Sequence, residues 1–293
     1  MKQPLLTIAI PTYNRAHELD KQLAWAVNAI DGRWDEVELI VSDNASPDET
    51  PQICQSWQYR SQNHLGVFRQ PDNIGIVRNC LFCVQQARGE YVWLVSDDDR
   101  IAPHTLNRVL DWLTRKHGCR LSFLHLNGNK ATPDGAIVRA GVYPFQDDLF
   151  SASGTDLFRQ CADIYEDWMM LITANIYSTA VAKAAIQHWP GVSNNLAFPL
   201  YLAGYAAARG AMAVCAPVCL TDNLAYSRAN WIHIIFHDIP QSYWHLRGTG
   251  MPESLIRRRI MTRISFLAFM VRFPKSFLRS LRFYWQAAQL PKS

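Results

Sequence analysis

Three consecutive carboxylates, Asp97, Asp98 and Asp99, follow directly on an apolar run from Tyr91 to Val95. Adjacent like charges repel each other, so the arrangement indicates that a positive charge is held beside them. Carboxylate oxygens suit Mn²⁺ or Mg²⁺, and such an ion can neutralise the charge on a departing diphosphate. Because successive residues leaving a strand point in alternate directions, we expect Asp97 and Asp99 to face one way and Asp98 the other. The alternative is an acidic turn that caps the following helix, although a cap needs only one Asp.

Polar groups also follow two earlier apolar runs, at PTYN and at SDNAS. Pro11 fixes a turn, Thr12 supplies a hydroxyl group, and the ring of Tyr13 can stack on a nucleobase or belong to the core. Asp43 can accept a hydrogen bond from an N–H group of a base. Alternatively, Asp43 or Ser46 caps the helix that follows. Both segments therefore carry groups that suit a nucleotide.

The elements that must position these groups alternate between strands and helices. Apolar runs predict strands at residues 5–11, 37–43, 64–70 and 90–97, and helical patterns predict helices at residues 15–30, 47–57, 74–87 and 103–115. This alternation predicts an α/β fold whose mostly parallel sheet is covered by helices on both faces. Because ligands gather at the carboxyl ends of such strands, PTYNR, SDNAS and SDDDR should share one rim.

Four pieces of the sequence occur in a distinctive order: IAIPTYNRAHELDKQL, ELIVSDNASPDET, PDNIGIVRNCLFCVQQARGEYVWLVSDDD and the Pro103 that follows. Together they resemble the nucleotide-sugar domain of the family 2 glycosyltransferases, whose Rossmann-like fold is called GT-A. The nearer resemblance is to the O-antigen sugar transferases, the abequosyltransferase-like branch, in which the acidic motif often reads Ser-Asp-Asp-Asp. The resemblance is dense up to about residue 115 and thin beyond it.

The resemblance implies a nucleotide-diphospho-sugar donor and a Mn²⁺ or Mg²⁺ ion. When the family motif Asp-x-Asp-Asp is counted back from Pro103, Ser96 stands where the first Asp would be. Metal ligation then falls to Asp98 and Asp99, with Asp97 or Ser96 toward the ribose. The donor contacts that the resemblance implies are Pro11, Thr12, Tyr13, Arg15, Asp43, Asn73, Gly75, Arg78, Asn79, Asp97, Asp98 and Arg228. For Arg78, a plain surface position on its helix is an equal alternative.

An inverting transfer, which the resemblance also implies, needs a carboxylate that takes the proton of the attacking hydroxyl group. The family often supplies it as a Glu-Asp pair at the start of a helix, but the corresponding stretch here, SNNLAFPLYLAGYAAARG, contains no carboxylate. We expect Asp167 to be the catalytic base, with Glu166 and Asp222 as the other candidates. The alternative for Asp167 is a solvated loop acid or a helix terminus.

The segment YSRANWIHIIFH carries further candidates. It resembles the end of the catalytic domain in this branch, which would bring Arg228 to the diphosphate and Trp231 to the acceptor pocket. His233 and His237 are four residues apart, so an α-helix would place both on one face and within reach of one metal ion. Two histidines without a third ligand are more often surface or core residues, and that interpretation is favoured.

Positive charge is concentrated at the C-terminus. Nine of the 29 Lys and Arg residues lie from Arg257 onward without a single acidic residue, whereas all 25 acidic residues precede it. Apolar residues at helical spacing predict basic amphipathic helices, which suit an anionic membrane surface and hence a lipid-linked acceptor. The alternative is a tail packed on the catalytic domain or on a second subunit of a homo-oligomer. We therefore predict a nucleotide-sugar half at residues 1–115, an acceptor half at 116–235 and a membrane-associating helical tail at 236–293.

Composition narrows the class of protein. The chain has 293 residues, 49% of them hydrophobic, which allows a large core. No segment approaches the roughly 20 apolar residues of a membrane-spanning helix, and the N-terminus lacks a signal-peptide pattern. Seven irregularly spaced cysteines indicate buried thiols in a reducing compartment. We expect a cytoplasmic protein, peripheral at the inner face of the cell membrane, with no nucleic-acid partner because no nucleic-acid motif is present.

Two other functions stay open at this point. A metal-dependent nucleotidyltransferase or phosphatase would also use clustered Asp residues, but PTYNR, after the first strand, has neither an Asp-x-Asp motif nor a glycine-rich basic sequence. A catalytically inactive nucleotide- or glycan-binding module would explain the missing Glu-Asp pair. The prediction that the sequence favours is a metal-dependent, inverting glycosyltransferase of surface polysaccharide, such as lipopolysaccharide O-antigen.

Overall fold

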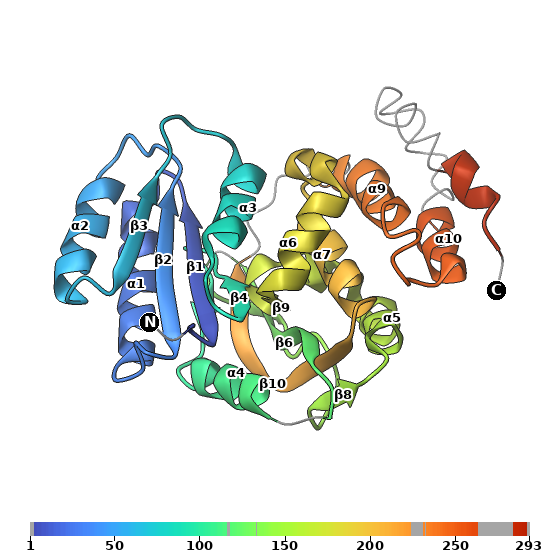
Figure 1. Ribbon diagram of the computed structural model, residues 1–293, viewed down its shortest axis with the longest axis horizontal. Coiled ribbons are helices and arrows are strands. Elements are labelled where there is room, and N and C mark those ends of the chain that lie inside the picture. Colours follow the sequence, from blue (N-terminus) through green and yellow to red (C-terminus); the bar gives the residue numbers. More distant parts are fainter. Residues whose placement is uncertain are drawn as a thin grey trace.

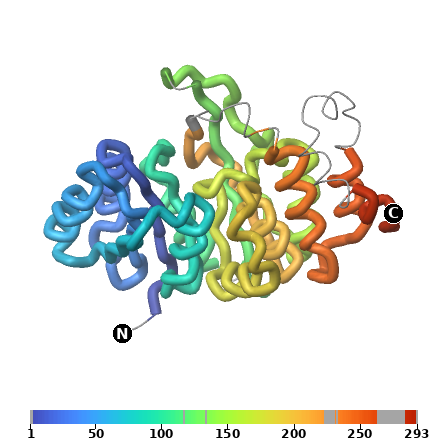
Figure 2. Tube along the Cα trace, turned by 90° about the horizontal axis from the view of Figure 1, so that it is seen from above, coloured from blue at the N-terminus to red at the C-terminus, as the bar shows by residue number. Residues whose placement is uncertain are grey.

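A ten-stranded mixed sheet runs through the molecule (Figure 1). The computed structural model describes residues 3–115, 118–132, 134–223, 231, 233–262 and 284–291. The strands lie in the order β3-β2-β1-β4-β9-β6-β10-β5, with β7 paired to β6 and β8 paired to β10. Figure 2 shows from above that the N-terminal strands and helices, in blue, lie at one end of the molecule and the C-terminal helices, in orange and red, at the other.

The first half consists of the predicted parallel strands and their crossover helices. The strands are β1 (Leu6–Thr12), β2 (Val37–Asp43), β3 (Leu65–Arg69) and β4 (Tyr91–Leu94), and the helices are α1 (Ala16–Ile30), α2 (Thr50–Arg60) and α3 (Ile76–Gln86). Every residue of β1, β2 and β4 is buried, as their apolar runs require. Helices α1 and α2 pack together on one face of the sheet, and α3 lies on the other (Figure 1). The predicted α/β fold is confirmed.

The connection from β3 to β4 reverses the direction in which strands are added. Strands β1, β2 and β3 are added successively toward one edge, whereas β4 pairs with the other side of β1. Right-handed crossovers then place α3 opposite α1 and α2. The crevice between the carboxyl ends of β1 and β4 is the point where ligands bind in folds of this kind.

The second half continues the same sheet with antiparallel additions. Its strands are β5 (Arg100–Ile101), β6 (Leu121–Ala131), β7 (Ile137–Arg139), β8 (Leu149–Ser151), β9 (Asn175–Ser178) and β10 (Ala211–Asn223). Strand β9 is antiparallel to both of its neighbours, β4 and β6, whereas β6 and β10 are parallel. The predicted division near residue 115 therefore falls within one continuous sheet.

The helices of this half cover the sheet and connect its strands. They are α4 (Thr105–Thr114), α5 (Gly154–Tyr165), α6 (Thr179–His188) and α7 (Phe198–Ala207), with the 3₁₀ turns η1 (Glu166–Met170), η2 (Ile172–Ala174) and η3 (Pro190–Asn194). All ten residues of α7 are buried. A helix surrounded by other elements is apolar on every side, as the sequence of α7 is.

Two predicted boundaries are wrong. The strand predicted at residues 90–97 ends at Leu94, because the chain then turns and the backbone N–H of Ser96 donates to Thr173 Oγ1 at 2.9 Å. The helix predicted from Pro47 begins at Thr50, because the carboxylate of Asp48 accepts from the backbone N–H groups of Thr50 and Ala16 in the turn before it. The acidic residues therefore stand on a loop rather than on a strand.

The C-terminal part of the described chain packs on the body. It comprises the π-helical turn η4 (Ile234–Asp238), α9 (Ile239–Trp244), α10 (Glu253–Met261) and a helical segment at residues 284–288. The apolar side of α10, formed by Leu255, Ile256 and Ile260, is buried, and Arg258 and Arg259 both pair with Asp163 of α5. For α10 the structure thus shows the alternative to the membrane interpretation, a helix packed on the body of the protein. Residues 263–283, which carry most of the rest of the predicted tail, lie outside the described residues.

Within the described ranges, none of the helices combines the length and the apolar composition that crossing a membrane requires.

Candidate active site

A cavity of about 430 Å³ opens where β1 and β4 end. Its walls come from the β1–α1 connection, the start of α3, the acidic loop after β4, the η1–η2 region and the end of β10. The lining residues that were predicted from the sequence are Pro11, Thr12, Tyr13, Arg15, Asn73, Asn79, Asp97, Asp98, Asp99 and Asp222. The sheet topology therefore brings together residues that are up to about 200 positions apart in the sequence.

Arg15, just before α1, supplies the positive charge beside the acidic loop. Its guanidinium Nη1 lies 3.2 Å from Asp97 Oδ1 and also pairs with Asp98. Thr12 Oγ1 donates a hydrogen bond to Asp97 Oδ2 at 2.7 Å. Burial lowers the pKa of Arg15, but its hydrogen bond to Asp98 and the charges of Asp97 and Asp98 outweigh that effect and raise it. The predicted alternation of Asp97 and Asp98 is wrong, because both carboxylates reach the same guanidinium from a loop.

Asp99 is the acidic residue of this loop whose hydrogen bonding is incomplete. It is buried, and among the described residues its Oδ2 atom has no hydrogen-bond partner. Burial raises the pKa of Asp99 well above its usual range, and the charges of Asp222, Asp98 and Asp97 add to this, while a hydrogen bond with Thr173 opposes it. A buried oxygen without a partner is costly. A divalent cation with a preference for oxygen ligands would satisfy it, so the residues fit such an ion.

Asp97 shares this environment. Burial raises the pKa of Asp97 to about 6, although its hydrogen bond from Thr12 and the charge of Arg15 act in the opposite direction. The cluster as a whole therefore resists full ionisation. A bound cation would shift it toward the charged form, because an opposite charge within a few ångströms favours ionised carboxylates.

A second pair of carboxylates lies beside the cavity, around Lys130 of β6. Lys130 Nζ lies 3.9 Å from Asp222 Oδ2 and 3.4 Å from Tyr165 Oη. Burial raises the pKa of both Asp222 and Asp167, and the charge of Lys130 opposes the shift in each. Asp222 lines the main cavity and also a small adjoining pocket that Asp167 and Trp231 line. Two carboxylates with raised pKa values beside one cavity are candidates for proton transfer.

Glu166 does not reach either cavity. Its Oε1 atom accepts a hydrogen bond from Tyr243 Oη at 2.7 Å and lies 3.6 Å from Arg259 Nη1. The carboxylate joins η1 to α9 and α10, so the structure gives it a packing role. The placement of Glu166 among the catalytic candidates is therefore corrected.

Three other predicted donor contacts, Asp43, Gly75 and Arg78, lie off the cavity wall. Asp43 is buried, pairs with Arg69 and accepts from the backbone N–H of Ser46 at 2.9 Å. The alternative in which Asp43 or Ser46 caps the following helix is wrong, because α2 begins at Thr50 and its N-cap is Glu49. Arg78 is exposed on α3 and donates to Asn194 Oδ1 at 3.2 Å. None of the three is among the residues that line the cavity. Arg228 lies outside the described residues.

Asn44, which follows Asp43 directly, takes the position on the wall that was predicted for the carboxylate. Its Nδ2 atom donates to Asn73 Oδ1 at 2.9 Å, and its Oδ1 atom accepts from the backbone N–H of Ile74 at 2.9 Å. Asn73 Oδ1 also accepts from the backbone N–H of Gly75, whose φ of 86° lets the chain turn into α3. Asn79 lines the cavity and bonds Ser42 through both side-chain atoms.

Lys130 and Asn44 are the polar residues that sequence reasoning missed. Asn44 stands one residue past a strand end, and that position alone was a usable signal. Lys130 lies inside an almost entirely buried strand, and no motif marks it.

Residues 7–128 match the family model described as Glycosyl transferase family 2. Over 102 residues the chain is 34% identical to abequosyltransferase RfbV of Salmonella typhimurium. The aligned region covers 35% of this chain and 30% of that protein. Over 108 residues it is 30% identical to the GalNAc(5)-diNAcBac-PP-undecaprenol beta-1,3-glucosyltransferase of Campylobacter jejuni, covering 36% of this chain and 34% of that protein. The chain thus spans about a third of these curated relatives.

The fold is similar to that of solved glycosyltransferases over nearly the whole chain. Staphylococcus aureus TarS 1–349, in complex with UDP, superposes with a TM-score of 0.71 over 97% of this chain and 81% of that one, at 17% identity. The mannosyltransferase PcManGT from Pyrobaculum calidifontis, in complex with GDP-Man and Mn²⁺, gives a TM-score of 0.59 over 98% and 76%, at 15% identity. At these identities the likeness shows the fold alone.

Proposed function

Because residues 7–128 match the family model described as Glycosyl transferase family 2, we propose that this chain transfers a sugar from a nucleotide-diphospho-sugar donor to a glycan acceptor in polysaccharide synthesis. The predicted resemblance to this family, near the abequosyltransferase-like branch, is confirmed by the match to RfbV. The observation that carries the proposed activity is the buried acidic loop, Asp97 to Asp99, on one wall of a 430 Å³ cavity at the sheet's switch point.

The donor's nucleotide would lie against the β1 side of the cavity. Tyr13 is 43% exposed and offers a ring on which a base can stack. Asn44, Asn73 and Thr12 supply amide and hydroxyl groups along the same wall. Arg15 carries the positive charge that suits a diphosphate. These groups bind and orient the donor without forming a bond to it.

Asp98 and Asp99 would hold a Mn²⁺ or Mg²⁺ ion. When bound, such an ion supplies positive charge that stabilises the departing diphosphate. The unpartnered Oδ2 atom of Asp99 and the two neighbouring carboxylates support this proposal. The PcManGT structure, solved with Mn²⁺, is consistent with it.

Asp222 is the base that the geometry favours for an inverting transfer. It lines both the main cavity and the adjoining pocket, so its carboxylate can meet an acceptor hydroxyl group at the junction. The acceptor oxygen attacks the anomeric carbon, the bond from that carbon to the diphosphate oxygen breaks, and the diphosphate leaves with the electron pair. The hydroxyl proton passes to Asp222, whose raised pKa suits a proton acceptor. This choice places Asp222 before Asp167, the first choice from the sequence.

Lys130 would position the base. Its ammonium group lies between Tyr165 and Asp222 and lowers the pKa of Asp222 against the effect of burial. The charge of Lys130 thus favours the ionised form of Asp222, which is the form that accepts a proton.

The acceptor is proposed to be lipid-linked, as in the Campylobacter jejuni relative, whose name gives a PP-undecaprenol substrate. Access to such an acceptor would require the protein to associate with the inner face of the cell membrane. The pocket lined by Asp167, Trp168 and Trp231 is the adjoining surface on which a sugar of the acceptor could pack.

A panel of nucleotide sugars tests the proposed function directly. The full chain is incubated with UDP-, GDP-, CDP- and dTDP-sugars, with and without Mn²⁺, and Tm and release of the nucleoside diphosphate are measured. We expect one donor to raise Tm in the presence of Mn²⁺ and to be turned over slowly. A donor that stabilises the protein without any turnover or transfer would identify an inactive binding module, and no stabilisation by any donor would exclude the proposal.

A further inference from the structure

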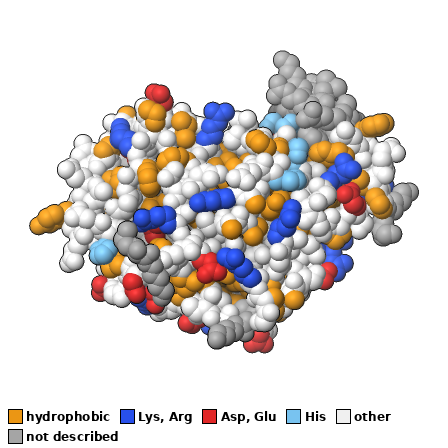
Figure 3. All heavy atoms as spheres, in the orientation of Figure 1, with side chains coloured by type: hydrophobic (Ala, Val, Ile, Leu, Met, Phe, Trp, Pro, Cys, Tyr) orange, Lys and Arg blue, Asp and Glu red, His pale blue; other side chains and the backbone are white. Residues whose placement is uncertain are grey.

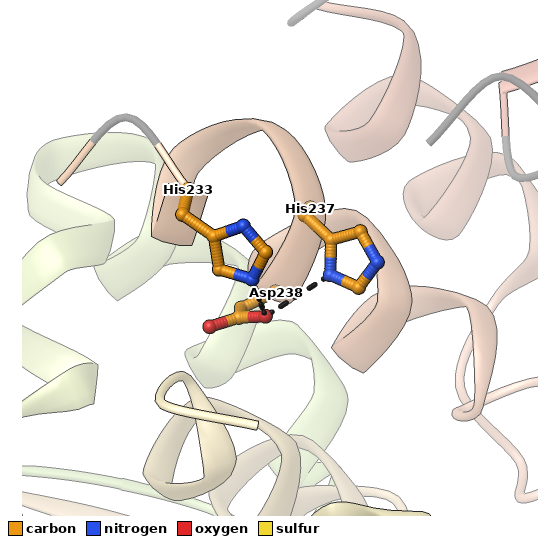
Figure 4. A group of neighbouring side chains, drawn as sticks. All are labelled: His233, His237 and Asp238. Carbon is orange, nitrogen blue, oxygen red and sulfur yellow. Dashed lines mark hydrogen bonds and ion pairs between the residues drawn. The ribbon is translucent and has the colours of Figure 1, made fainter. Parts of the chain in front are cut away.

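Three metal-binding side chains converge at η4, outside both cavities (Figure 4). His233 Nε2 lies 3.3 Å from Asp238 Oδ1, and His237 Nδ1 lies 3.1 Å from the same oxygen. The ligand atoms of the three residues all lie within 4.8 Å of one another, and the two imidazole rings are stacked at 4.7 Å. The sequence indicated two of these ligands but not the third.

The π-helical backbone is what brings in the third ligand. In an α-helix each residue advances by about 100°, so Asp238, five residues after His233, would lie about 140° away around the helix. In η4 the backbone N–H of Ile239 bonds the carbonyl of Ile234, five residues earlier. One turn therefore takes about one more residue, and Asp238 joins the histidines on one face. Such turns are rare and frequently occur at functional sites.

Pro240 accounts for the change of helical register. It has no backbone N–H, so it cannot donate to the carbonyl of Phe236, which an α-helix would require. That carbonyl accepts instead from Tyr284 Oη at 3.3 Å. The C-terminal helical segment thus fixes the turn from outside.

The carboxylate of Asp238 is held with one oxygen toward the histidines. Asp238 is buried, and its Oδ2 atom accepts from the backbone N–H of Leu196 at 3.1 Å. Asn195 Nδ2 donates to its backbone carbonyl at 3.0 Å. These contacts orient the carboxylate, as neighbouring hydrogen bonds orient the ligands of a metal site.

We propose that His233, His237 and Asp238 form a binding site for a transition-metal ion of the Zn²⁺ class, separate from the oxygen-ligand site at Asp98 and Asp99. Two imidazoles and one carboxylate suit Zn²⁺, and ligand bonds of about 2.0–2.2 Å in a tetrahedral arrangement place neighbouring ligand atoms about 3.4 Å apart. The two N···O distances already match this separation. The imidazole nitrogens approach each other by rotation of the side chains, and each ring carries its proton on its other nitrogen or releases it.

The site is open to an incoming ion. The side chains of His233 and His237 are 39% and 17% exposed, and Figure 3 shows histidine side chains at the surface near α9. Three protein ligands leave a fourth tetrahedral position for water or another ligand. Ile234, on the same turn, lines both cavities, so an ion bound here would hold one wall of the candidate active site in place.

Metal titration of the full chain tests this site. Protein stripped with EDTA and supplied with excess Mg²⁺, which occupies oxygen-ligand sites, is titrated with ZnCl₂ by calorimetry and with CoCl₂ by visible absorption. We expect one equivalent of Zn²⁺ and a tetrahedral Co²⁺ absorption band. His233→Ala and His237→Ala should each weaken Zn²⁺ binding by at least about 100-fold, since even partners of ligands cost 10–100-fold. His17→Ala, which removes an exposed histidine of α1, is the matched control and should bind normally.

Asp98→Asn should keep the Zn²⁺ equivalent and lose only Mn²⁺ binding, which separates this site from the proposed donor site. Equal Zn²⁺ affinity in the wild type and both histidine variants would overturn the proposal. So would variants that merely lower Tm without metal and leave Zn²⁺ binding unchanged, because the imidazoles would then serve only as hydrogen-bond donors to Asp238. Circular dichroism of each variant verifies that it is folded.

Discussion

The side chain of Arg15 stands beside Asp97 and Asp98, where a divalent ion would compete for the same oxygens. It partly neutralises the loop when no donor is present, which explains how adjacent carboxylates are tolerated. Asp99 receives no such help from Arg15, and its Oδ2 atom has no partner among the described residues. We therefore expect the two kinds of carboxylate to differ in how much they depend on a bound cation.

Asp98→Asn and Asp99→Asn should each abolish metal-dependent donor binding. Removing a charged ligand should cost more than the 10–100-fold that outer-shell changes cost. Calorimetric titration with Mn²⁺ and donor measures the loss. Asp111→Asn, an exposed acid on α4, is the control and should bind normally.

Asp99→Asn should also leave the apo protein as stable as the wild type or more so, because a neutral amide replaces a buried carboxylate whose Oδ2 atom has no partner among the described residues. Full donor affinity in both variants would remove the metal from the proposed function.

Asp222→Asn should lower kcat by about 10²–10⁴-fold with little change in donor affinity, because it removes the proton acceptor and leaves the donor wall intact. Asp167→Asn, in the adjoining pocket, should affect mainly the KM for the acceptor. Steady-state kinetics with the donor identified by the panel separates the two. The reverse pattern would make Asp167 the base, as the sequence first suggested.

At the scale of elements, a buried polar contact joins β6 to β9 in the middle of the sheet. His125 Nδ1 lies 2.8 Å from Asn175 Oδ1, and Tyr143 Oη donates to its Nε2 atom at 2.9 Å. Burial lowers the pKa of His125 to about 4, although the hydrogen bonds to Asn175 and to the carbonyl of Ala174 oppose this. The imidazole is therefore neutral in the folded protein, with one nitrogen donating and the other accepting.

This contact should make the fold sensitive to acid. An unfolded histidine has a pKa of about 6.5, so between pH 6.5 and 4 the unfolded chain takes up a proton that the folded protein does not. As the pH is lowered through this range, the free energy of unfolding should decrease. This residue should account for a decrease of about 2 kcal/mol at pH 5. In urea unfolding at pH 5 and 7.5, His125→Gln should reduce the difference between the two values by that amount.

His64→Gln, at an exposed position, should leave the difference between pH 5 and pH 7.5 as it is in the wild type. An unchanged difference in His125→Gln would show that the imidazole is not held neutral.

For the whole molecule, the basic C-terminal region has two kinds of side chain. Ile256 and Ile260 of α10 are buried against the body, and Tyr284 and Ala287 are buried too, whereas Trp285 is 69% exposed. The first group stabilises the fold. Exposed aromatic and basic side chains are what an anionic membrane surface would contact, so membrane association stays a prediction that Trp285 can test.

Ile260→Ala should lower the free energy of unfolding by about 2–4 kcal/mol because it leaves a cavity under α10, with little effect on vesicle binding of the folded protein. Trp285→Ala should leave stability within about 0.5 kcal/mol and weaken sedimentation with vesicles that contain anionic lipid. Salt should release part of the bound wild type. If Trp285→Ala and the wild type sediment equally, or if neither sediments, membrane binding through Trp285 is excluded. This surface would then contact only protein.

The order of the first strands and helices was determined by the sequence alone. Short, mainly apolar runs such as those of β1, β2 and β4, which alternate with helical patterns, predict strands buried on both faces, and the polar residues after them should then meet at one rim. Asp97, Asp98, Asp99, Thr12 and Tyr13 were located in this way, because their neighbours in the sequence fix their position. The helical spacing of apolar residues likewise predicted the buried face of α10, but it did not indicate which part of the protein would cover that face.

Only the tertiary structure decided which distant side chains share an environment. Lys130 and Asp222 meet because β6 and β10 pair in parallel, and sequence spacing carries no trace of a contact between residues 92 positions apart. Asp238 joins His233 and His237 because a π-helical turn adds a residue, against the α-helical spacing that sequence patterns assume. Strand pairing and helical register depend on the packing of the whole chain, so the partners of each charge become known only when the chain is folded.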